Sequence, residues 1–241
     1  LNGETLSMFT GSARSYEREL DVRYGVHRRS LRWAGRRASL DTLDERFASY
    51  ANLHLIPSRY RITAEQPGTL ELETGIDGEV WSLHGDHFAS YQPFADDGKL
   101  FMRTVTGEQG IEVVVGEAMR LQRRRPDGAL EELTLPETEE TTPVAVRYEQ
   151  GERYLLRHIT VSVQAGDTLF LEKHMAVYHS NDGPEPAKRC RSALEEVLSQ
   201  GYTGALEAHR AIWDEKWRRF DIEIEGDLKA QTLLRYNLYQ N

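Results

Sequence analysis

Hydrophobic and polar residues alternate, or run apolar for a few positions, through most of the first 180 residues. GTLELE and RYRITA alternate almost strictly, which is typical of strands with one face on a core and one in water. IEVVVGEAM is apolar enough to lie between two layers. The strand pattern covers residues 24–33, 38–51, 54–64, 68–76, 99–106, 111–121, 143–150, 153–163 and 167–179.

Turn residues close these segments. Gly, Asp, Asn and Pro gather in TGIDGEV, DDGK, PDG, QAGD and SNDGPEP, where chain reversals need a positive or a preset φ. No helical pattern lies between the strand segments, so nothing indicates a βαβ unit. We therefore expect a mainly β fold with a large antiparallel β-sandwich over residues 1–183.

After Gly183 the period becomes helical. Pro184 and Pro186 lie near a helix start, and Gly201 ends this helix. Its apolar face is Cys190, Leu194, Val197 and Leu198. A second apolar stripe recurs every three or four residues at Tyr202, Leu206, His209, Ile212, Trp213, Lys216, Trp217 and Phe220. The pattern predicts an α-helical linker over residues 184–221.

The last segment, residues 222–241, alternates briefly and then forms a helix that Asp227 caps. Its apolar residues cover more than one face: Leu228, Leu233, Leu234, Tyr236, Leu238 and Tyr239. That is too much for a solvated tail, and the chain starts at Leu1 rather than Met, so we expect both ends to be cut. In this chain Leu234, Tyr236, Leu238 and Tyr239 should be unusually exposed.

Composition narrows the classes of function. With 39 acidic and 30 basic side chains the net charge is −9, which disfavours nucleic acid as a partner. No apolar run approaches the roughly 20 residues of a membrane span. Arg120 and Arg123–Arg125 lead into Pro126-Asp127-Gly128, a predicted hairpin turn with its flanking charges in water. The single cysteine, Cys190, suits a cytoplasmic protein and is interpreted as an ordinary helix residue.

One loop could carry binding chemistry. In GEVWSLHGDHF, residues Trp81, His84, Asp86 and His87 lie close together, and Trp can stack on sugar rings while Asp and His bond hydroxyls. A loop this polar more often bonds its own backbone. A third metal ligand at a usable spacing is absent, so we predict no metal site, and GxGxxG, GxxxxGK[ST], HExxH and GxSxG are missing.

Five blocks in order resemble the front portion of glycoside hydrolase family 65. They are YERELDVRYGVHRRSLRW, DERFASYANLHLIPSRYRI, TGIDGEVW, DTLFLEKHMAVYHS and HRAIWDEKWRRFDIEIEGD with RYNLYQN, and the resemblance runs from about Tyr16 to Asn241. It implies a β-sandwich, a helical linker and, from residue 222, the first helix of a truncated (α/α)₆ barrel. The general acid and the phosphate-binding residues would lie beyond Asn241, so no catalytic residue is assigned here.

The resemblance implies a structural and dimerisation module of an α-glucoside phosphorylase. The complete enzyme would cleave an α-linked glucose disaccharide with inorganic phosphate as co-substrate, without a cofactor, and with inversion. The module's partners would be its own catalytic barrel and a second copy. The alternatives are the same module of a family 65 hydrolase, and a self-sufficient carbohydrate-binding sandwich that uses the Trp81 loop. TGIDGEVW is more similar to the kojibiose and glucosylglycerol type than to the maltose type.

Overall fold

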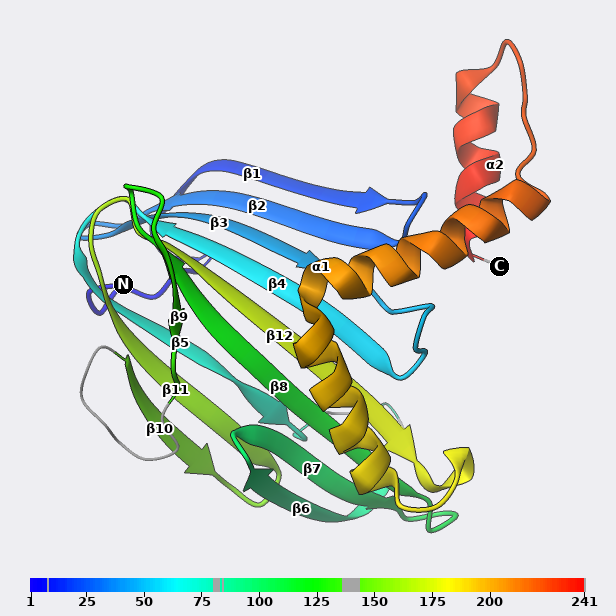
Figure 1. Cartoon of the computed structure of the whole chain (residues 1–241), viewed down its shortest axis with the longest axis horizontal. Coiled ribbons are helices and arrows are strands. Elements are labelled where there is room, and N and C mark those ends of the chain that lie inside the picture. Colours follow the sequence, from blue (N-terminus) through cyan, green and yellow to red (C-terminus); the bar gives the residue numbers. More distant parts are fainter. Residues whose placement is uncertain (8, 80–82, 84, 136–143, 241) are drawn as a thin grey trace.

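The described part of the chain forms two antiparallel sheets, two α-helices and one short 3₁₀ helix. The computed structural model describes residues 1–7, 9–79, 83, 85–135 and 144–240. The larger sheet has the order β1-β2-β3-β4-β12-β8-β7-β6, with β9 paired to β8, and the smaller has the order β10-β11-β5 (Figure 1). The strands are β1 Ser12–Asp21, β2 Val26–Ala34, β3 Ser39–Arg46, β4 Leu55–Ala64, β5 Gly68–Asp77, β6 Phe88–Asp96, β7 Lys99–Thr106, β8 Glu112–Arg124, β9 Leu130–Leu133, β10 Val144–Gln150, β11 Tyr154–Val163 and β12 Thr168–His179.

The sequence pattern found most of these strands and missed three. Each of the nine predicted segments contains one strand. The missed strands are β1, β6 and β9. β1 is exposed along almost its whole length, β6 lies at the other edge and contains Pro93, and β9 has four residues. Edge strands carry charges and proline instead of an apolar alternation, so their signal is weak.

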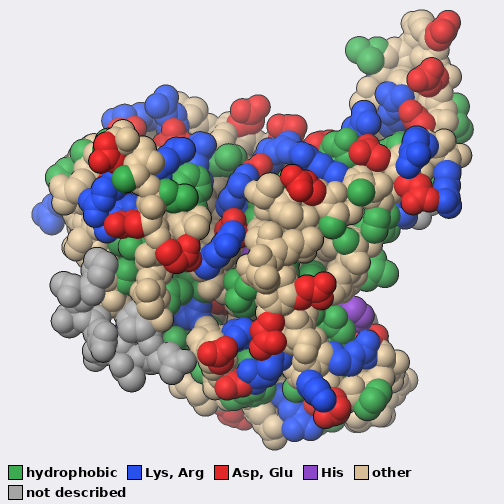
Figure 2. Space-filling model, viewed as in Figure 1, with side chains coloured by type: hydrophobic (Ala, Val, Ile, Leu, Met, Phe, Trp, Pro, Cys, Tyr) green, Lys and Arg blue, Asp and Glu red, His purple; other side chains and the backbone are tan. Residues whose placement is uncertain are grey.

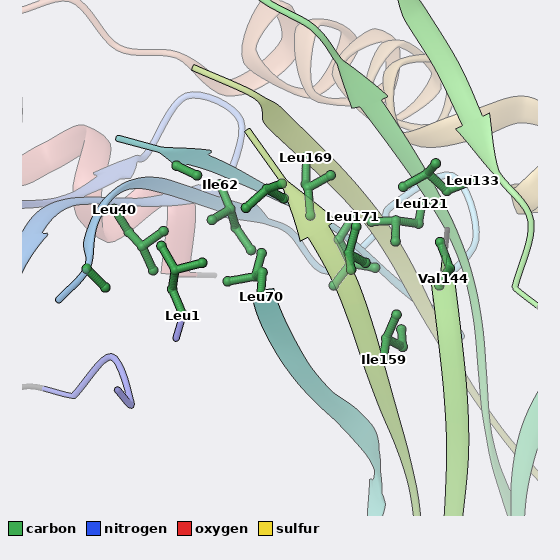
Figure 3. Close-up of a cluster of buried hydrophobic side chains, with 14 of the residues drawn as sticks. Leu1, Leu40, Ile62, Leu70, Leu121, Leu133, Val144, Ile159, Leu169 and Leu171 are labelled. Atoms are coloured by element: carbon green, nitrogen blue, oxygen red, sulfur yellow. The ribbon is translucent and has the colours of Figure 1, made fainter. Parts of the chain in front are cut away.

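The core of the sandwich lies between the two sheets. Leu40, Ile62, Leu121 and Leu169 of the large sheet meet residues of β5, β10 and β11, among them Ile159 (Figure 3). Each such side chain contributes about 1.5–3 kcal/mol through burial. The predicted β-sandwich is therefore confirmed as two packed sheets.

The opposite face of the large sheet is covered by helix α1, Pro186–Phe220, which follows the short 3₁₀ turn η1, Ser180–Asp182 (Figure 1). Cys190 and Leu194 of α1 pack against Phe101, Val114 and the neighbouring strands. A Cβ on Gly116 of β8 would lie 2.6 Å from Cys190 Sγ, so only glycine allows the helix this close.

Helix α1 breaks at Gly201, where the sequence predicts a helix end. Gly201 has φ 71° and ψ 168°, a conformation that other residues rarely adopt. The break frees the N–H of Tyr202, which donates to Glu172 Oε2 at 3.0 Å. Arg120 Nε donates to the same oxygen at 2.9 Å. The carboxylate of Glu172, in strand β12, therefore acts as the N-terminal cap of the outer half of α1, residues 202–220.

The groups around Glu172 lower its pKa by more than burial raises it. Burial alone would raise the pKa of this carboxyl, but the nearby His174 ring, the hydrogen bond from the Tyr202 amide and the charge of Arg120 lower it to about 2. Arg120 thus has a structural partner and does not extend freely into water. Arg123 is also buried and pairs with Glu131, so the prediction of solvated flanking charges was wrong for these two residues, while the hairpin turn itself is confirmed.

A second buried ion cluster joins the two sheets. Glu117 of β8 lies 2.8 Å from Lys173 Nζ of β12 and 3.7 Å from Arg157 of β11, and accepts a hydrogen bond from Thr74 of β5 at 3.2 Å. Glu117 and Arg157 are fully buried. Two cations therefore compensate one carboxylate in the inter-sheet core.

Replacing Glu172 with Gln should destabilise the protein by about 3 kcal/mol at pH 7, because the drop in the pKa of Glu172 from 4.5 to about 2 measures how strongly the folded state favours its carboxylate. A carboxyl with a lowered folded-state pKa contributes fully above its ordinary value of 4.5 and loses that contribution as the pH falls toward 2. Urea unfolding of both proteins should show the difference shrinking over this window. Glu196→Gln, on an exposed position of the same helix, is the control. An equal difference at pH 7 and pH 2.5 would contradict the capping role.

Replacing Glu117 with Gln should cost about 3–5 kcal/mol, because Lys173 and Arg157 would remain in the core without a counter-charge. Denaturant unfolding at pH 7 measures this cost. Glu112→Gln in the same strand removes a more exposed pair with Arg103 and should change stability by less than about 1 kcal/mol. Similar costs for the two variants would show that the cluster contributes no more than a surface pair.

Candidate functional site

The predicted polar loop is only partly within the described residues. Trp81 and His84 lie outside them. Asp86 Oδ1 accepts hydrogen bonds from the Phe88 N–H at 3.1 Å and from the Tyr91 hydroxyl at 2.9 Å, and Oδ2 lies 2.6 Å from Arg153. The Phe88 amide, followed by Tyr91 and Arg153, lowers the pKa of Asp86. These contacts tie the loop to β6 and to the turn before β11.

His87 points to a different partner. Its Nδ1 lies 2.9 Å from Glu108 in the turn between β7 and β8, and its carbonyl accepts from the Gly107 N–H. The contacts of Asp86 and His87 therefore do not converge on one point. Within the described ranges, no group of His, Cys, Asp and Glu side chains could hold a metal ion. A sugar-binding role of the loop stays a prediction.

Cys190 has no reactive character. It is fully buried, its thiol donates weakly to the Ala176 carbonyl, and burial raises its pKa to about 12. The interpretation as an ordinary helix cysteine is confirmed. No described helix is long and apolar enough to cross a membrane.

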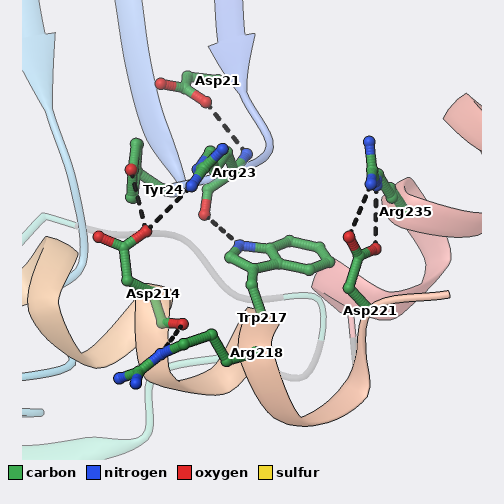
Figure 4. A network of polar contacts seen from close by, with 8 residues as sticks. All are labelled: Asp21, Arg23, Tyr24, Asp214, Trp217, Arg218, Asp221 and Arg235. Atoms are coloured by element: carbon green, nitrogen blue, oxygen red, sulfur yellow. Dashed lines mark hydrogen bonds and ion pairs between the residues drawn. The ribbon is translucent and has the colours of Figure 1, made fainter. Parts of the chain in front are cut away.

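A group of long-range polar contacts lies where the β1–β2 turn meets the outer half of α1 (Figure 4). Trp217 Nε1 donates to the Arg23 carbonyl at 2.5 Å. The Tyr24 hydroxyl and Arg23 Nη2 both donate to Asp214 Oδ1, at 3.0 and 3.3 Å. These bonds join residues about 190 positions apart and fix the direction in which α1 leaves the sandwich.

An aromatic cluster backs this junction. Trp213 packs edge-on against Tyr50, with ring centroids 4.9 Å apart, and is stacked near Trp217 and Tyr239 at 5.9 and 5.5 Å. Trp213 and Trp217 are both buried. The stripe that the sequence predicts on the second helix is therefore structural and packs on the sandwich loops and on the last helix.

Helix α2, Leu228–Gln240, is held at its beginning by local bonds. The Asp227 side chain accepts from the Ala230 N–H at 2.9 Å, which confirms the predicted cap. Gln231 bonds the backbone of Ile222 and Ile224, and Arg235 forms a two-point pair with Asp221. A cavity of about 610 Å³ lies between this segment and the β1–β2 turn, lined on one side by Arg23 and Trp217 and on the other by Asp221 and Arg235.

No residue of α2 is buried, and the segment before it is equally open. Its most exposed large apolar side chains are Leu228 at 82%, Leu233 at 54% and Tyr236 at 42%, with Ile222 and Ile224 beside them. The predicted exposure is confirmed for Tyr236. It is wrong for Leu234, Leu238 and Tyr239, which are half-buried, Tyr239 because it packs on Trp213 and Gly25.

These five residues, Ile222, Ile224, Leu228, Leu233 and Tyr236, form what we call the α2 apolar surface. Single exposed apolar side chains are common, but five within fifteen residues indicate a contact surface, and they lie on α2 and the extended segment before it, which project from the rest of the molecule (Figure 2). Neither this surface nor the β1–β2 junction contains a nucleophile paired with a base. The geometry therefore favours docking over chemistry at this end of the chain.

Comparison with known proteins identifies the family. The family model described as glycosyl hydrolase family 65, N-terminal domain, matches residues 1–216. The chain is 30% identical to 1,2-alpha-glucosylglycerol phosphorylase of Bacillus selenitireducens over 99% of its length, and 24% identical to nigerose phosphorylase of Lachnoclostridium phytofermentans over 94%. It spans 29% and 30% of the lengths of these two relatives.

A solved structure shows the same fold. A putative kojibiose phosphorylase from the human microbiome superposes with a TM-score of 0.83 over 98% of this chain and 29% of that chain, at 13% sequence identity. Because the family model covers most of the chain and the fold agrees, the chain belongs to glycosyl hydrolase family 65 and contains the N-terminal domain of that family.

Proposed function

We propose that this chain is the sandwich and linker of an α-glucoside phosphorylase, and that α2 begins its catalytic (α/α)₆ barrel. The observation that carries the proposal is the α2 apolar surface. A helix of 13 residues is marginal in water without tertiary packing, and α2 buries none of its residues. Further helices of a barrel would cover the surface and stabilise α2.

The relatives support the class of reaction. Those named above are phosphorylases, and each is more than three times as long as the part that this chain matches. In the proposed reaction, a carboxylic acid protonates the glycosidic oxygen while inorganic phosphate attacks the opposite face of the sugar, with inversion. Both groups would act in the barrel. A hydrolase of the same family would use water and a second carboxylate in place of phosphate.

The role of the sandwich would then be to hold the first barrel helix at a fixed angle. The β1–β2 turn contributes Arg23 and Tyr24, and α1 contributes Asp214 and Trp217. We further propose a cytoplasmic homodimer whose substrate is an α-linked glucose disaccharide or glucosylglycerol. The 30% identity to the glucosylglycerol phosphorylase supports this choice of substrates.

The complete protein should release glucose 1-phosphate from one member of a panel of glucosylglycerol, kojibiose, nigerose, maltose and trehalose, and only when inorganic phosphate is present. Proton NMR of the fresh product should show the β-anomer, because inversion converts an α-linkage to a β-phosphate. The 241-residue chain alone, at equal concentration, is the control and should be inactive. Release of free glucose without phosphate would show a hydrolase instead.

Replacing Leu233 and Tyr236 together with Glu should leave the stability of the isolated chain within about 0.5 kcal/mol, since both side chains are exposed there. In the complete protein the same change should abolish activity or cost several kcal/mol, because it would bury two carboxylates. Thermal unfolding measures the stability of the isolated chain and of the complete protein, and the phosphate assay measures the activity of the complete protein. Lys229→Glu, also exposed on α2, is the matched control. A complete protein that tolerates the double change would contradict docking at this surface.

A further inference from the structure

His209 joins the outer half of α1 to two separate loops of the sandwich. Its Nδ1 accepts the backbone N–H of Tyr50, in the β3–β4 loop, at 3.0 Å. Its Nε2 donates to the backbone carbonyl of Tyr24, in the β1–β2 turn, at 2.6 Å. The ring packs 4.6 Å from Phe47 and is 1% exposed. One imidazole thus bonds loops that lie 159 and 185 residues away in sequence.

These partners fix the charge of the ring. A backbone N–H can only donate, so Nδ1 must carry a lone pair, and a carbonyl can only accept, so Nε2 must carry the proton. His209 is therefore neutral with its proton on Nε2. A protonated ring would set an N–H on Nδ1 against the N–H of Tyr50, and the two donors would face each other without an acceptor between them.

The surroundings oppose protonation as well. Burial lowers the pKa of His209 below its ordinary value of 6.5, and the charge of Arg210 lowers it further. Within the described residues, no ion pair connects His209 to a carboxylate. The other charged or titratable groups around the junction are Arg23 and Tyr24 of the β1–β2 turn, Tyr50 of the β3–β4 loop, Asp214 and Lys216 of α1, and Tyr239 of α2.

A pivot already exists at the inner end of this segment. At Gly201 the helix is broken, so the axis of residues 202–220 can tilt there without unwinding a turn, while Tyr202 itself stays buried and bonded to Glu172. Beyond the pivot, the bonds from Trp217 to the Arg23 carbonyl and from Tyr24 to Asp214 reach only the β1–β2 turn. Ring contacts of Tyr50 with Trp213 and Lys216 also reach the β3–β4 loop, but among the described residues the hydrogen bond to the Tyr50 N–H depends on neutral His209.

We propose that His209 is a pH-sensitive latch: in its neutral form it holds the outer half of α1 and helix α2 against the sandwich, and protonation releases this segment to tilt at Gly201. The latch is a property of this chain and does not depend on the catalytic proposal. As the pH falls from 6.5 to the lower pKa of the docked ring, the population of the released state rises by up to tenfold for each pH unit.

The test is amide hydrogen exchange followed by NMR between pH 7.5 and 5. The protection factor of the Tyr50 amide and that of the Trp217 indole N–H should fall together as the pH drops, by up to tenfold per unit. Amides in the central strands β8 and β12 report global unfolding and should keep their protection. The His209 ring should titrate below the ordinary histidine pKa of 6.5.

Two variants that do not titrate separate the latch from general loss of packing. His209→Asn places an acceptor where Nδ1 lies, so Tyr50 protection should become independent of pH. His209→Gln keeps a donor for the Tyr24 carbonyl but removes the acceptor, so Tyr50 protection should be low at every pH. Protection of Tyr50 and Trp217 that stays constant in the native protein down to pH 5, or that falls equally in His209→Asn, would overturn the proposal.

Discussion

The central strands of the large sheet have to be covered on both faces, and the rest of the structure follows from this constraint. β8 and β12 pair along their whole length, and their side chains contact the small sheet on one side and α1 on the other. A strand buried on both faces leaves no solvated position for its polar residues. Glu117 is therefore neutralised by cations of β11 and β12, and Glu172 by Arg120 and the broken helix.

The same constraint explains why α1 is long and broken. To cover the sheet, its inner half must approach β8 closely, which Gly116 permits. To leave the sheet, it must change direction, which Gly201 permits and Glu172 compensates. The outer half then runs to the β1–β2 turn, where His209, Asp214 and Trp217 find polar partners. The path of α1 thus has two effects: its inner half covers the sheet, and its outer half sets the position of α2.

The features that the sequence predicts correctly are those that depend on the local hydrophobic periodicity and on turn and capping residues. The alternating strands, the helix break at Gly201 and the cap at Asp227 are written in a few neighbouring residues. Strand β1 was not predicted, because an exposed edge strand has no alternation of apolar residues. Its sequence, SARSYERELD, is mostly polar. The resemblance to family 65 is confirmed by the family model, which matches residues 1–216.

The contacts of the junction could not be predicted, because they join positions about 160 to 190 residues apart. Every residue has a backbone carbonyl, so the sequence does not indicate that those of Arg23 and Tyr24 each accept a short hydrogen bond from α1. The α2 stripe was recognised, but its exposed part differs from the prediction, since Tyr239 turns toward Trp213. In the polar loop, Asp86 bonds its own neighbours, as polar loop residues commonly do.

Placement of α2 against a catalytic barrel is the central claim, and hydrogen exchange of the α2 backbone tests it most directly. The isolated chain and the complete protein should be compared at one pH and temperature. Amides of residues 232–240 should be only weakly protected in the isolated chain, where α2 has no buried residue, and should be strongly protected in the complete protein. Equal protection in both would show that α2 is stabilised by this chain alone and has no further partner.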